Sequence, residues 1–355
     1  MIKLLIVDDS ALMRRQLSTL FEAEGDFEIR QARNGKEGVS ENSSFRPDVV
    51  TLDINMPEMD GITALSLMMA DRPVPVVMVS SLTEAGALAT FEALNLGAVD
   101  YVTKPGGTIS LSIGAVKQEL ISKVRAAARA RLKSKGTGAR GLAERLRSER
   151  ESKVRPLAAR HGVVGEGVVL IGVSTGGPRT LEDILPLLPA DFPWPVLVAQ
   201  HMPASFTRPF AERLDTLCAL HVVEAAHPMP VEVGTVYIGK GGADILLARR
   251  VGKLTVLAKP ENREFLWHPS VELLGRSALE VCDPSRIVAV MLTGMGHDGA
   301  DAFAEIKKRG GRTIAESEAS AVVFGMPAEL IERGGATVVL ASDKIAAQIN
   351  TWVLR

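Results

Sequence analysis

The chain contains few of the residues that disulfide-stabilised or membrane-spanning proteins need. Only two of its 355 residues are cysteines, Cys218 and Cys282, and their separation gives no metal-ligand spacing. We therefore expect both to be reduced core residues. No apolar run approaches the roughly 18 residues of a membrane helix, and the apolar run at the start of the chain is too short for a signal peptide. The sequence thus predicts a cytoplasmic protein without membrane insertion.

The chain also lacks an excess of either charge, because its 41 basic and 42 acidic residues leave a net charge of -1. Such a balance produces no overall field that would attract nucleic acid. Residues 123–160 do contain thirteen Lys or Arg against three Glu. This basic run has no aromatic side chain that could stack on bases. We predict a solvated, partly helical linker over 123–165 and no nucleic-acid binding.

The rest of the sequence alternates between short apolar runs and amphipathic helical patterns, over 1–122 and again over 166–352. A length of 355 residues suits two domains, and this alternation predicts a parallel sheet flanked by helices in each. Residues 222–257 have the pattern of shorter antiparallel strands inserted in the second sheet. The predicted fold class is α/β, with a flavodoxin-like domain followed by a Rossmann-like one.

Polar side chains follow the predicted strands of the first domain. Asp8 and Asp9 follow the first strand and Asp53 ends the third, while Ser80 and Lys104 end later ones. Because parallel strands end at one edge of a sheet, three carboxylates should converge there. A hard divalent cation such as Mg²⁺ removes their mutual repulsion. A carboxylate beside Mg²⁺ can attack a phosphoryl group, with a lysine neutralising the oxygens.

Four stretches of this domain resemble a response-regulator receiver domain: DD at 8–9, LDINMPEMDG at 52–61, VSS at 79–81 and YVTKP at 101–105. The resemblance implies a five-stranded sheet, phosphorylation of Asp53 and a histidine kinase as phosphodonor. The implied Mg²⁺ ligands are Asp8, Asp9, Asp53 and the carbonyl of Asn55. The implied switch residues are Ser80, Tyr101 and Lys104. The alternative is a metal-free acidic pocket on the same fold.

A glycine-rich turn, GVSTGGP at 172–178, follows the first predicted strand of the second domain. Its glycines permit a sharp strand-to-helix turn that would present Ser174 beside helix N–H groups. Such a turn alone is also compatible with a nucleotide loop. The P-loop ending and the G-x-G-x-x-G spacing are both missing from it, however. Ser174 therefore needs partners before it can be interpreted as a nucleophile.

Two further strands supply those partners. His201 directly follows the strand PVLVAQ, and Asp298 lies in LTGMGHDGA after the strand IVAVM. A serine becomes nucleophilic when a histidine takes its proton and an acidic group orients that histidine. The order Ser, His, Asp differs from that of α/β-hydrolases, so the turn is no evidence for the α/β-hydrolase fold. His297 is the competing base, but a loop position between Gly296 and Asp298 favours a solvent-exposed side chain.

Four stretches of the second domain resemble a CheB-type chemotaxis methylesterase domain: GVSTGGP at 172–178, AQHMPASFT at 199–207, LTGMGHDGA at 292–300 and VVFGMP at 322–327. The resemblance implies hydrolysis of glutamate methyl esters on chemoreceptors, with release of methanol, and deamidation of receptor glutamines. It implies Ser174 as nucleophile, His201 as base and acid, and Asp298 as orienting group, with no cofactor. Backbone N–H groups around Thr175 and Met295 are the expected oxyanion donors. We also expect a monomer.

The sequence departs from that family pattern around the expected cleft. Asp244 lies near the position of a usual histidine, and WHPSVE at 267–272 replaces a usual His-Arg-Pro-Ser-Val-Asp, which changes Trp267 and His268. Glu316 begins a Glu-Ser pair where Gln-Asp is usual. We expect these changes to affect which substrate fits, rather than the reaction type. They also leave open a function outside chemotaxis.

The leading hypothesis for regulation is that the unphosphorylated receiver covers the esterase cleft, and that phosphorylation of Asp53 moves the domains apart. A catalytically silent module that binds a receptor or kinase is the rival from another class. The presence of Ser174, His201 and Asp298 together favours the enzyme.

Overall fold

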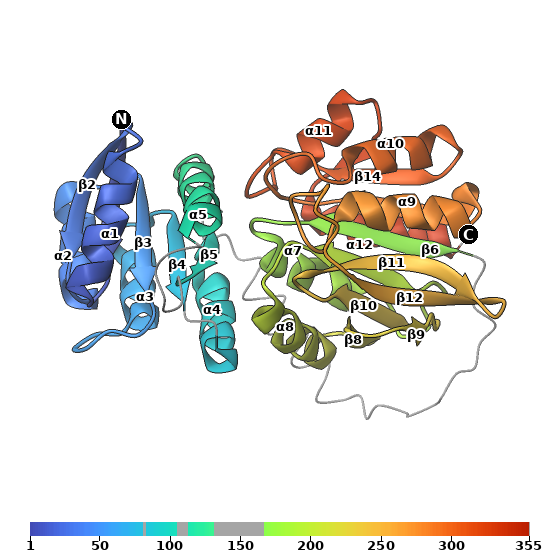
Figure 1. Cartoon of the computed structure of the whole chain (residues 1–355), viewed down its shortest axis with the longest axis horizontal. Helices are drawn as coiled ribbons and strands as arrows, with labels where there is room; N and C mark the ends of the chain where they lie inside the picture. Colours follow the sequence, from blue (N-terminus) through green and yellow to red (C-terminus); the bar gives the residue numbers. More distant parts are fainter. Residues whose placement is uncertain (81–82, 105–112, 131–166, 355) are drawn as a thin grey trace.

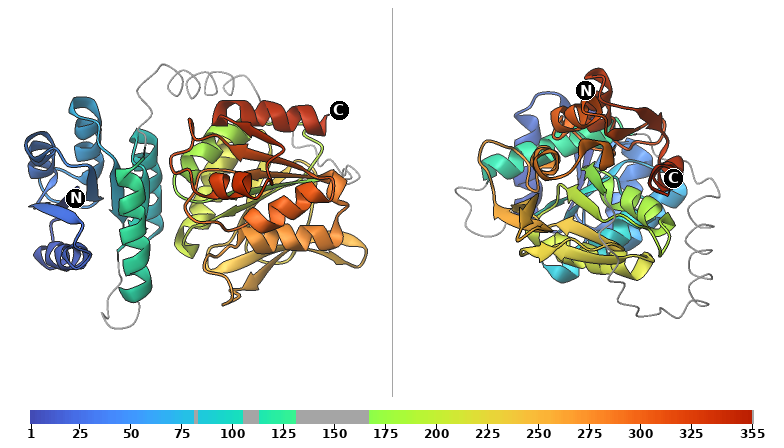
Figure 2. Two further views of the ribbon diagram at one scale, coloured as in Figure 1. Left: turned by 90° about the horizontal axis from the view of Figure 1, so that it is seen from above. Right: turned by 90° about the vertical axis from the view of Figure 1, so that its right-hand side faces the viewer.

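The computed structural model describes residues 1–80, 83–104, 113–130 and 167–354. These residues form two α/β units (Figure 1). In the sequence, one unit precedes the segment 131–166 and the other follows it. In each unit, helices cover both faces of a central sheet, and the two units lie side by side (Figure 2). The described part of the predicted linker is limited to residues 123–130, and the remainder, 131–165, lies outside the described residues.

The N-terminal unit is a five-stranded parallel sheet in the order β2-β1-β3-β4-β5. Its strands are β1 (Ile2–Val7), β2 (Phe27–Ala32), β3 (Val49–Asp53), β4 (Val76–Ser80) and β5 (Asp100–Thr103). Its helices are α1 (Ala11–Glu22), α2 (Gly35–Phe45), α3 (Gly61–Asp71), α4 (Glu84–Leu96) and α5 (Ile113–Ala128). The predicted fold is confirmed, and β3 and β4 are buried along their whole length, as central parallel strands are.

Local sequence determines where these helices begin. The side chains of Ser10, Asn34, Asp60 and Thr83 each accept a hydrogen bond from a backbone N–H in the first turn of α1 to α4 respectively. Such caps satisfy N–H groups that have no partner within the helix. Each cap therefore fixes the residue at which its helix begins. The residues between that point and the end of the preceding strand remain outside the helix and can form a pocket.

The predicted boundary at residue 122 falls inside α5, which continues to Ala128. Val124 and Ala127 are buried in the core of the N-terminal unit, so the first part of the basic run belongs to this unit. Lys123 is half-buried, with its Nζ 3.5 Å from Asp100 Oδ2 and 2.8 Å from the carbonyl oxygen of Tyr101. A count of charges along the sequence could not distinguish these structural residues from the solvated ones.

The C-terminal unit contains a seven-stranded parallel sheet in the order β15-β14-β13-β6-β7-β10-β8 and a three-stranded antiparallel sheet in the order β11-β12-β9. The large sheet consists of β6 (Val168–Val173), β7 (Val196–Gln200), β8 (His221–Ala225), β10 (Thr235–Gly239), β13 (Ile287–Met291), β14 (Arg312–Glu316) and β15 (Val338–Leu340). The small one consists of β9 (Met229–Pro230), β11 (Ala243–Arg250) and β12 (Lys253–Pro260).

The helices of this unit are α7 (Gly177–Ile184), α8 (Ala204–Leu217), α9 (Val271–Val281), α10 (Ala300–Lys308), α11 (Met326–Glu332) and α12 (Ser342–Val353), with short 3₁₀ turns at Leu185–Leu187 and Pro284–Arg286. The predicted α/β class with a small antiparallel part is confirmed. One detail of 222–257 was wrong, because β8 and β10 pair in parallel within the large sheet. Only β9, β11 and β12 are antiparallel.

Aromatic side chains connect the two units. The ring of Tyr101 in β5 stacks on Phe206 of α8, with centroids 4.6 Å apart and planes 13° apart. Phe91 of α4 contacts the rings of Phe206 and Phe210 at centroid distances of 6.1 and 5.3 Å. Val322 of the C-terminal unit also packs against the core beside α5. The α4, β5 and α5 side of the first unit thus lies against the second.

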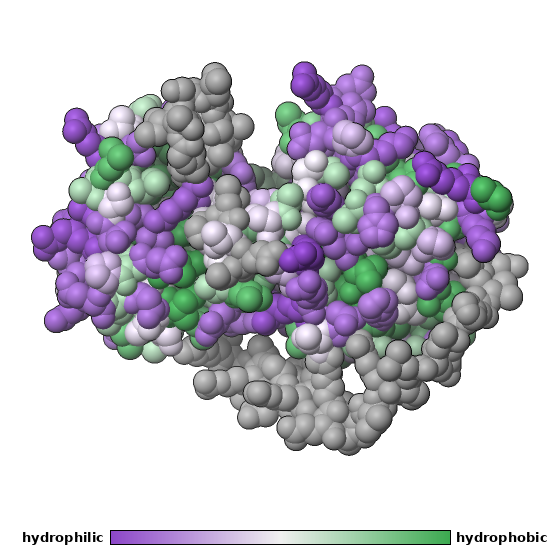
Figure 3. Space-filling view, turned by 60° about the horizontal axis from the view of Figure 1, so that its bottom comes forward, coloured by the Kyte–Doolittle hydropathy of each residue, from purple (hydrophilic) through white to green (hydrophobic). Residues whose placement is uncertain are grey.

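None of the helices described here is long and apolar enough to cross a membrane. Cys218 is buried and Cys282 half-buried, and both are free thiols. Burial raises the pKa of the Cys282 thiol to about 11, so it stays protonated at neutral pH. On the face shown in Figure 3, apolar side chains occur in small groups among charged and polar ones.

Lys123 provides a test of the packing around α5. Burial raises the pKa of Asp100, and Lys123 is the cation that offsets part of this cost. Lys123→Met would leave that carboxylate buried without its cation, so we expect the N-terminal unit to lose about 3–5 kcal/mol of stability. The exposed Lys36→Met is the control and should change stability by less than about 0.5 kcal/mol. Urea unfolding followed by circular dichroism measures both. Equal midpoints for Lys123→Met and the wild type would show that Lys123 does not stabilise the charge of Asp100.

Candidate active site and acidic pocket

The carboxylates predicted to converge in the N-terminal unit do lie together. Ligand oxygens of Asp8, Asp9 and Asp53 all lie within 4.8 Å of one another, and Asp8 and Asp53 are buried. Lys104 Nζ is 2.7 Å from Asp53 Oδ2 and 3.2 Å from Asp8 Oδ2. The backbone N–H of Asn55 points to Asp53 Oδ1 at 3.4 Å. The three carboxylates and the lysine named from the sequence thus lie together, and their roles in binding metal and phosphate stay predictions.

The electrostatics of the pocket favour a further cation. Burial raises the pKa of Asp53, and the hydrogen bond and charge of Lys104 offset only part of that rise. Burial lowers the pKa of Lys104, but the nearby carboxylates raise it by more than burial lowers it, so the lysine stays charged. One lysine against three carboxylates leaves net negative charge among oxygen atoms. Mg²⁺ prefers such a donor set, so these residues fit the metal that the sequence implied.

Two of the three implied switch residues, Ser80 and Tyr101, lie in different surroundings. Ser80 ends β4 beside the pocket, and its hydroxyl donates to the carbonyl of Gly86 at 3.2 Å. Tyr101 is buried against the C-terminal unit, where burial and the charge of Asp100 raise the pKa of its phenol well above the ordinary value. The structure thus places the serine at the acidic pocket and the tyrosine at the junction of the units.

Ser174 and His201 lie next to each other at the carboxyl edge of the large sheet. Val173 and Gln200 are paired across β6 and β7, so the residues after them begin at the same level, on strands about 5 Å apart. The backbone N–H of His201 donates to the carbonyl of Val173 at 3.1 Å. Gln200 Nε2 donates to the carbonyls of Ser174 and His201, each at 3.0 Å. Sequence analysis missed this role of Gln200, which no motif signals.

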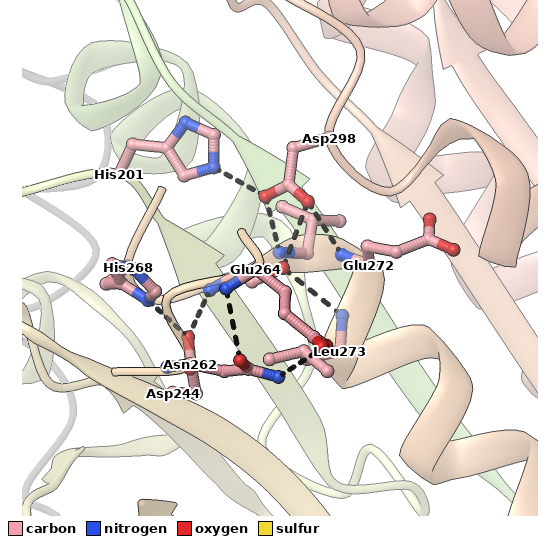
Figure 4. Close-up of polar contacts among 10 residues, drawn as sticks. His201, Asp244, Asn262, Glu264, His268, Glu272, Leu273 and Asp298 are labelled. Carbon is pink, nitrogen blue, oxygen red and sulfur yellow. Dashed lines mark hydrogen bonds and ion pairs between the residues drawn. The ribbon is translucent and has the colours of Figure 1, made fainter. Parts of the chain in front are cut away.

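Asp298 completes the pair with His201. Its Oδ2 is 2.8 Å from His201 Nε2, and the carboxylate is buried (Figure 4). The same carboxylate accepts hydrogen bonds from Ser270 Oγ at 3.0 Å, the N–H of Val271 at 2.7 Å and the N–H of Glu272 at 3.0 Å. The two N–H groups belong to the first turn of α9, where unpaired donors and the helix dipole stabilise an anion.

The charge of Asp298 is stabilised in spite of its burial. Burial by itself raises the pKa of this carboxyl, but the hydrogen bond and charge of His201 and the N–H groups of Val271 and Glu272 outweigh it, so the pKa falls below the ordinary value. An ionised Asp298 can only accept a hydrogen bond, so His201 Nε2–H donates to it. The buried Nδ1 of His201 has no hydrogen-bond partner among the described residues. That nitrogen is therefore the one available to accept a proton from a neighbouring hydroxyl.

The predicted oxyanion donors lie on loops that flank Ser174. Thr175 is buried, and its carbonyl accepts a hydrogen bond from Thr293 Oγ1 at 2.9 Å. Met295 follows Gly294, and a Cβ added at Gly294 would lie 2.8 Å from the Cβ of Ser174. Only glycine permits this close approach, which brings the backbone of Met295 near the serine. The donor role of both N–H groups remains a prediction.

Two of the departures from the family pattern are hydrogen-bonded to each other. Asp244 is buried, and its Oδ1 accepts from His268 Nδ1 at 2.9 Å and from the N–H of Ser270 at 3.0 Å. Its Oδ2 accepts from the N–H of Asn262 at 2.9 Å. Because Ser270 also donates to Asp298, this second acid–histidine pair is joined to the first (Figure 4).

Glu316, the third departure, supports the loop opposite Ser174. It is buried, and its Oε2 accepts from the N–H of Thr293 at 2.8 Å while Oε1 accepts from Ser320 Oγ at 2.9 Å. The carbonyl of Thr293 in turn accepts from the N–H of Ser174 at 3.0 Å. Glu316 therefore acts on the nucleophile's turn through the backbone, and it does not face a substrate directly.

The N-terminal unit lies close to this site. A cavity of about 450 Å³ separates α5 from the loops that carry Met295 and residues 322–325. Its lining residues are Ser122, Arg125, Ala126, Arg129, Met295, Val322, Val323, Phe324 and Gly325. Burial raises the pKa of Asp100 of β5, and the Thr175 hydroxyl is near enough to oppose that rise slightly, although the two side chains form no hydrogen bond. Thr175 is the residue after Ser174, so the first unit reaches the turn that holds the serine.

The fold and the site together define a two-part α/β protein in which an acidic pocket with a lysine accompanies a serine turn that lies beside a histidine–aspartate pair. Residues 4–112 match the family model of the response regulator receiver domain, and residues 169–349 match that of the CheB methylesterase.

Relatives match over nearly the whole chain. A protein-glutamate methylesterase/protein-glutamine glutaminase of Rhodospirillum rubrum is 55% identical over 363 residues, which covers 100% of this chain and 97% of the relative. One of Caldanaerobacter subterraneus is 50% identical over 348 residues, covering 97% and 95%. The solved catalytic domain of the Thermotoga maritima CheB methylesterase is 41% identical, with a TM-score of 0.51, and matches 54% of this chain and 100% of that domain. The chain belongs to the CheB methylesterase family of hydrolases and carries a receiver domain before its methylesterase domain.

The lowered pKa of Asp298 predicts how stability depends on pH. A carboxyl with a depressed pKa in the folded state stabilises the protein above its unfolded value of about 3.9, and this contribution is lost as pH falls through the folded pKa. Asp298→Asn should therefore destabilise the methylesterase domain by about 1.5–3 kcal/mol at pH 7. The difference from the wild type should shrink below about pH 4. Denaturant unfolding between pH 7 and pH 3 measures it.

The control for this experiment is the exposed Asp191→Asn, which should change stability by less than about 0.5 kcal/mol at any pH. A difference between wild type and Asp298→Asn that does not depend on pH would show that the carboxylate is not stabilised as a charge.

Proposed function

We propose that this enzyme hydrolyses methyl esters of glutamate side chains on chemoreceptors and deamidates receptor glutamines, with Ser174, His201 and Asp298 as its catalytic triad. The hydrogen bond between His201 Nε2 and the anchored Asp298 is the observation that carries this proposal. The relatives at 55% and 50% identity bear the names of these two activities. The cytoplasmic location and the monomeric state predicted from the sequence belong to the same proposal.

The mechanism follows from the two nitrogens of His201. With Nε2–H held by Asp298, Nδ1 takes the proton of Ser174 Oγ while that oxygen attacks the ester carbonyl. The N–H groups of Thr175 and Met295 would stabilise the negative charge that develops on the carbonyl oxygen. His201 then gives its proton to the departing methoxide, which leaves as methanol. Water repeats the sequence on the acyl-enzyme and releases glutamate. An amide follows the same steps and releases ammonia.

Regulation is proposed to come from the receiver domain, which lies against the turn that holds Ser174. Asp53 would accept a phosphoryl group from a histidine kinase, while Asp8, Asp9, Asp53 and the carbonyl of Asn55 would hold Mg²⁺. The metal supplies positive charge that neutralises the phosphoryl oxygens. Lys104 already pairs with Asp53 at 2.7 Å, so new charge on Asp53 would redistribute its contacts and those of Ser80. The domains would then separate at Tyr101 and Phe206.

Methanol release from a methylated chemoreceptor tests the activity and its control together. The wild type should release methanol, and acetyl phosphate with Mg²⁺ should raise the rate. Ser174→Ala should lower the rate by at least about 10³-fold because no nucleophile remains. Asp53→Asn should keep the basal rate and lose the response to acetyl phosphate. An active Ser174→Ala protein would contradict the triad, and a fully responsive Asp53→Asn protein would contradict the phosphoacceptor.

The aromatic contact between the domains gives a separate prediction. Tyr101→Leu keeps an apolar side chain but removes the ring that stacks on Phe206. An aromatic pair contributes about 0.5–1.5 kcal/mol beyond its area, so the closed arrangement should be weakened by about that amount. We expect methanol release without acetyl phosphate to rise about two- to tenfold. Tyr237→Phe, remote from the junction, is the control. A basal rate unchanged by Tyr101→Leu would show that this contact does not restrain the enzyme.

A further inference from the structure

The indole of Trp267 and the imidazole of His201 form a parallel, offset stack. The ring centroids are 5.5 Å apart and the planes differ by 3°. Trp267 stands where the family pattern usually has a histidine, so this stack is a property of this chain's own sequence. The other side chain at the indole is His297, whose ring meets it edge-on at 5.6 Å and 87°.

The backbone opposite Trp267 leaves room for the indole. Gly296 has a φ of +85°, and a Cβ added there would lie 2.9 Å from both Cη2 and Cζ2 of Trp267. Any larger residue at 296 would be strained and would also push the ring away from its place. The sequence of the loop after β13 is therefore fitted to the tryptophan as well as to Ser174.

The segment that carries Trp267 is held on its C-terminal side by the acid–histidine network. His268, the next residue, bonds to the buried Asp244, and Ser270 donates to Asp298 through its hydroxyl. Asp298 in turn bonds to His201. The indole and the imidazole are thus anchored to the same carboxylate by separate paths, which limits their movement relative to each other.

The chemistry of the triad gives this contact a use. His201 is neutral before the reaction and becomes an imidazolium when it takes the proton of Ser174. The face of an indole is electron-rich and attracts a cation within about 6 Å of its centroid. A neutral imidazole gains less from that face, so the interaction is strongest when the positive charge develops. The parallel stack also restrains the plane of the imidazole ring.

We propose that Trp267 is a positioning residue that orients His201 and stabilises its protonated form during catalysis. Asp298 is the ionisable group bonded to His201. His297, on the loop after β13, contacts the indole edge-on. The Asp244–His268 pair lies beyond Ser270. The inference rests on the proposed triad, but it does not depend on which ester the enzyme hydrolyses.

The reaction of Ser174 with phenylmethanesulfonyl fluoride tests this proposal without a receptor. The second-order labelling rate is measured from pH 5 to pH 9 on the full chain with acetyl phosphate and Mg²⁺, for wild type, Trp267→Phe and Trp267→Leu. Trp267→Leu should label about three- to tenfold more slowly on the plateau. The acid limb of its pH profile should move to lower pH by about half a unit or more, because the protonated imidazole loses its aromatic neighbour. Trp267→Phe should recover most of both effects.

Trp352→Phe, on α12 and away from the site, is the matched control and should label like the wild type. If Trp267→Leu does not fold, as judged by circular dichroism, Trp267→Met takes its place. A Trp267→Leu protein with the plateau and acid limb of the wild type would overturn the inference. So would equal losses in Trp267→Leu and Trp267→Phe, because the aromatic face would then contribute nothing.

Methanol release, measured on the same samples, separates this inference from the proposed function. A wild type that is labelled at Ser174 with the expected order of variants, but releases no methanol from a methylated receptor, would leave the role of Trp267 intact and show the substrate to be wrong. A wild type that is not labelled at Ser174 at any pH would overturn the role of Trp267, since His201 would then activate no nucleophile.

Discussion

The methylesterase site depends on one buried carboxylate. Asp298 is charged inside the protein because four donors, from His201, Ser270 and the first turn of α9, satisfy it. A buried charge without such partners would be strongly destabilising. The same bonds connect the loop after β13, the start of α9 and the end of β7. The contacts that join these three parts of the chain therefore also orient His201, the proposed catalytic base.

Most of the site could be predicted from the sequence because it lies at strand ends. Buried parallel strands have apolar sequences that are easy to find, and the residue after each one falls at the carboxyl edge of the sheet. This reasoning located Ser174, His201 and Asp298, and likewise Asp8 and Asp53 in the receiver. The structure brings the carboxylates of the acidic pocket together and pairs His201 with Asp298, and the family match agrees with hydrolase chemistry. The catalytic roles of these residues stay predictions.

The remaining features depend on contacts that local sequence does not encode. Gln200 and Ser270 act by bonding to backbone and carboxylate groups brought near by the fold. Lys123 belongs to a basic run, yet it is half-buried and pairs with the buried Asp100. The parallel pairing of β8 and β10 was missed for a similar reason, since short half-buried strands carry no signal of direction. Tertiary partners decide each of these cases.

The residues that depart from the family pattern hold two segments of the backbone near Ser174 and His201. Asp244 and His268 are hydrogen-bonded to each other, and they fix the segment that carries Trp267. Glu316 holds the loop that bonds to the turn of Ser174. At the other side of that turn, Thr175 lies beside Asp100 of the receiver. The nucleophile is therefore positioned by groups that vary in this chain and by the domain proposed to regulate it.

The central claim is that Ser174 forms a covalent acyl-enzyme with the help of His201 and Asp298. Rapid acid quench of the enzyme during turnover of a methylated receptor peptide, followed by digestion and mass spectrometry, tests it most directly. The account predicts that the peptide containing Ser174 carries the receptor peptide as an ester, with the loss of one methanol, and that His201→Gln abolishes this adduct. Methanol release at the normal rate with the adduct on another residue, or with the adduct still formed by His201→Gln, would contradict it.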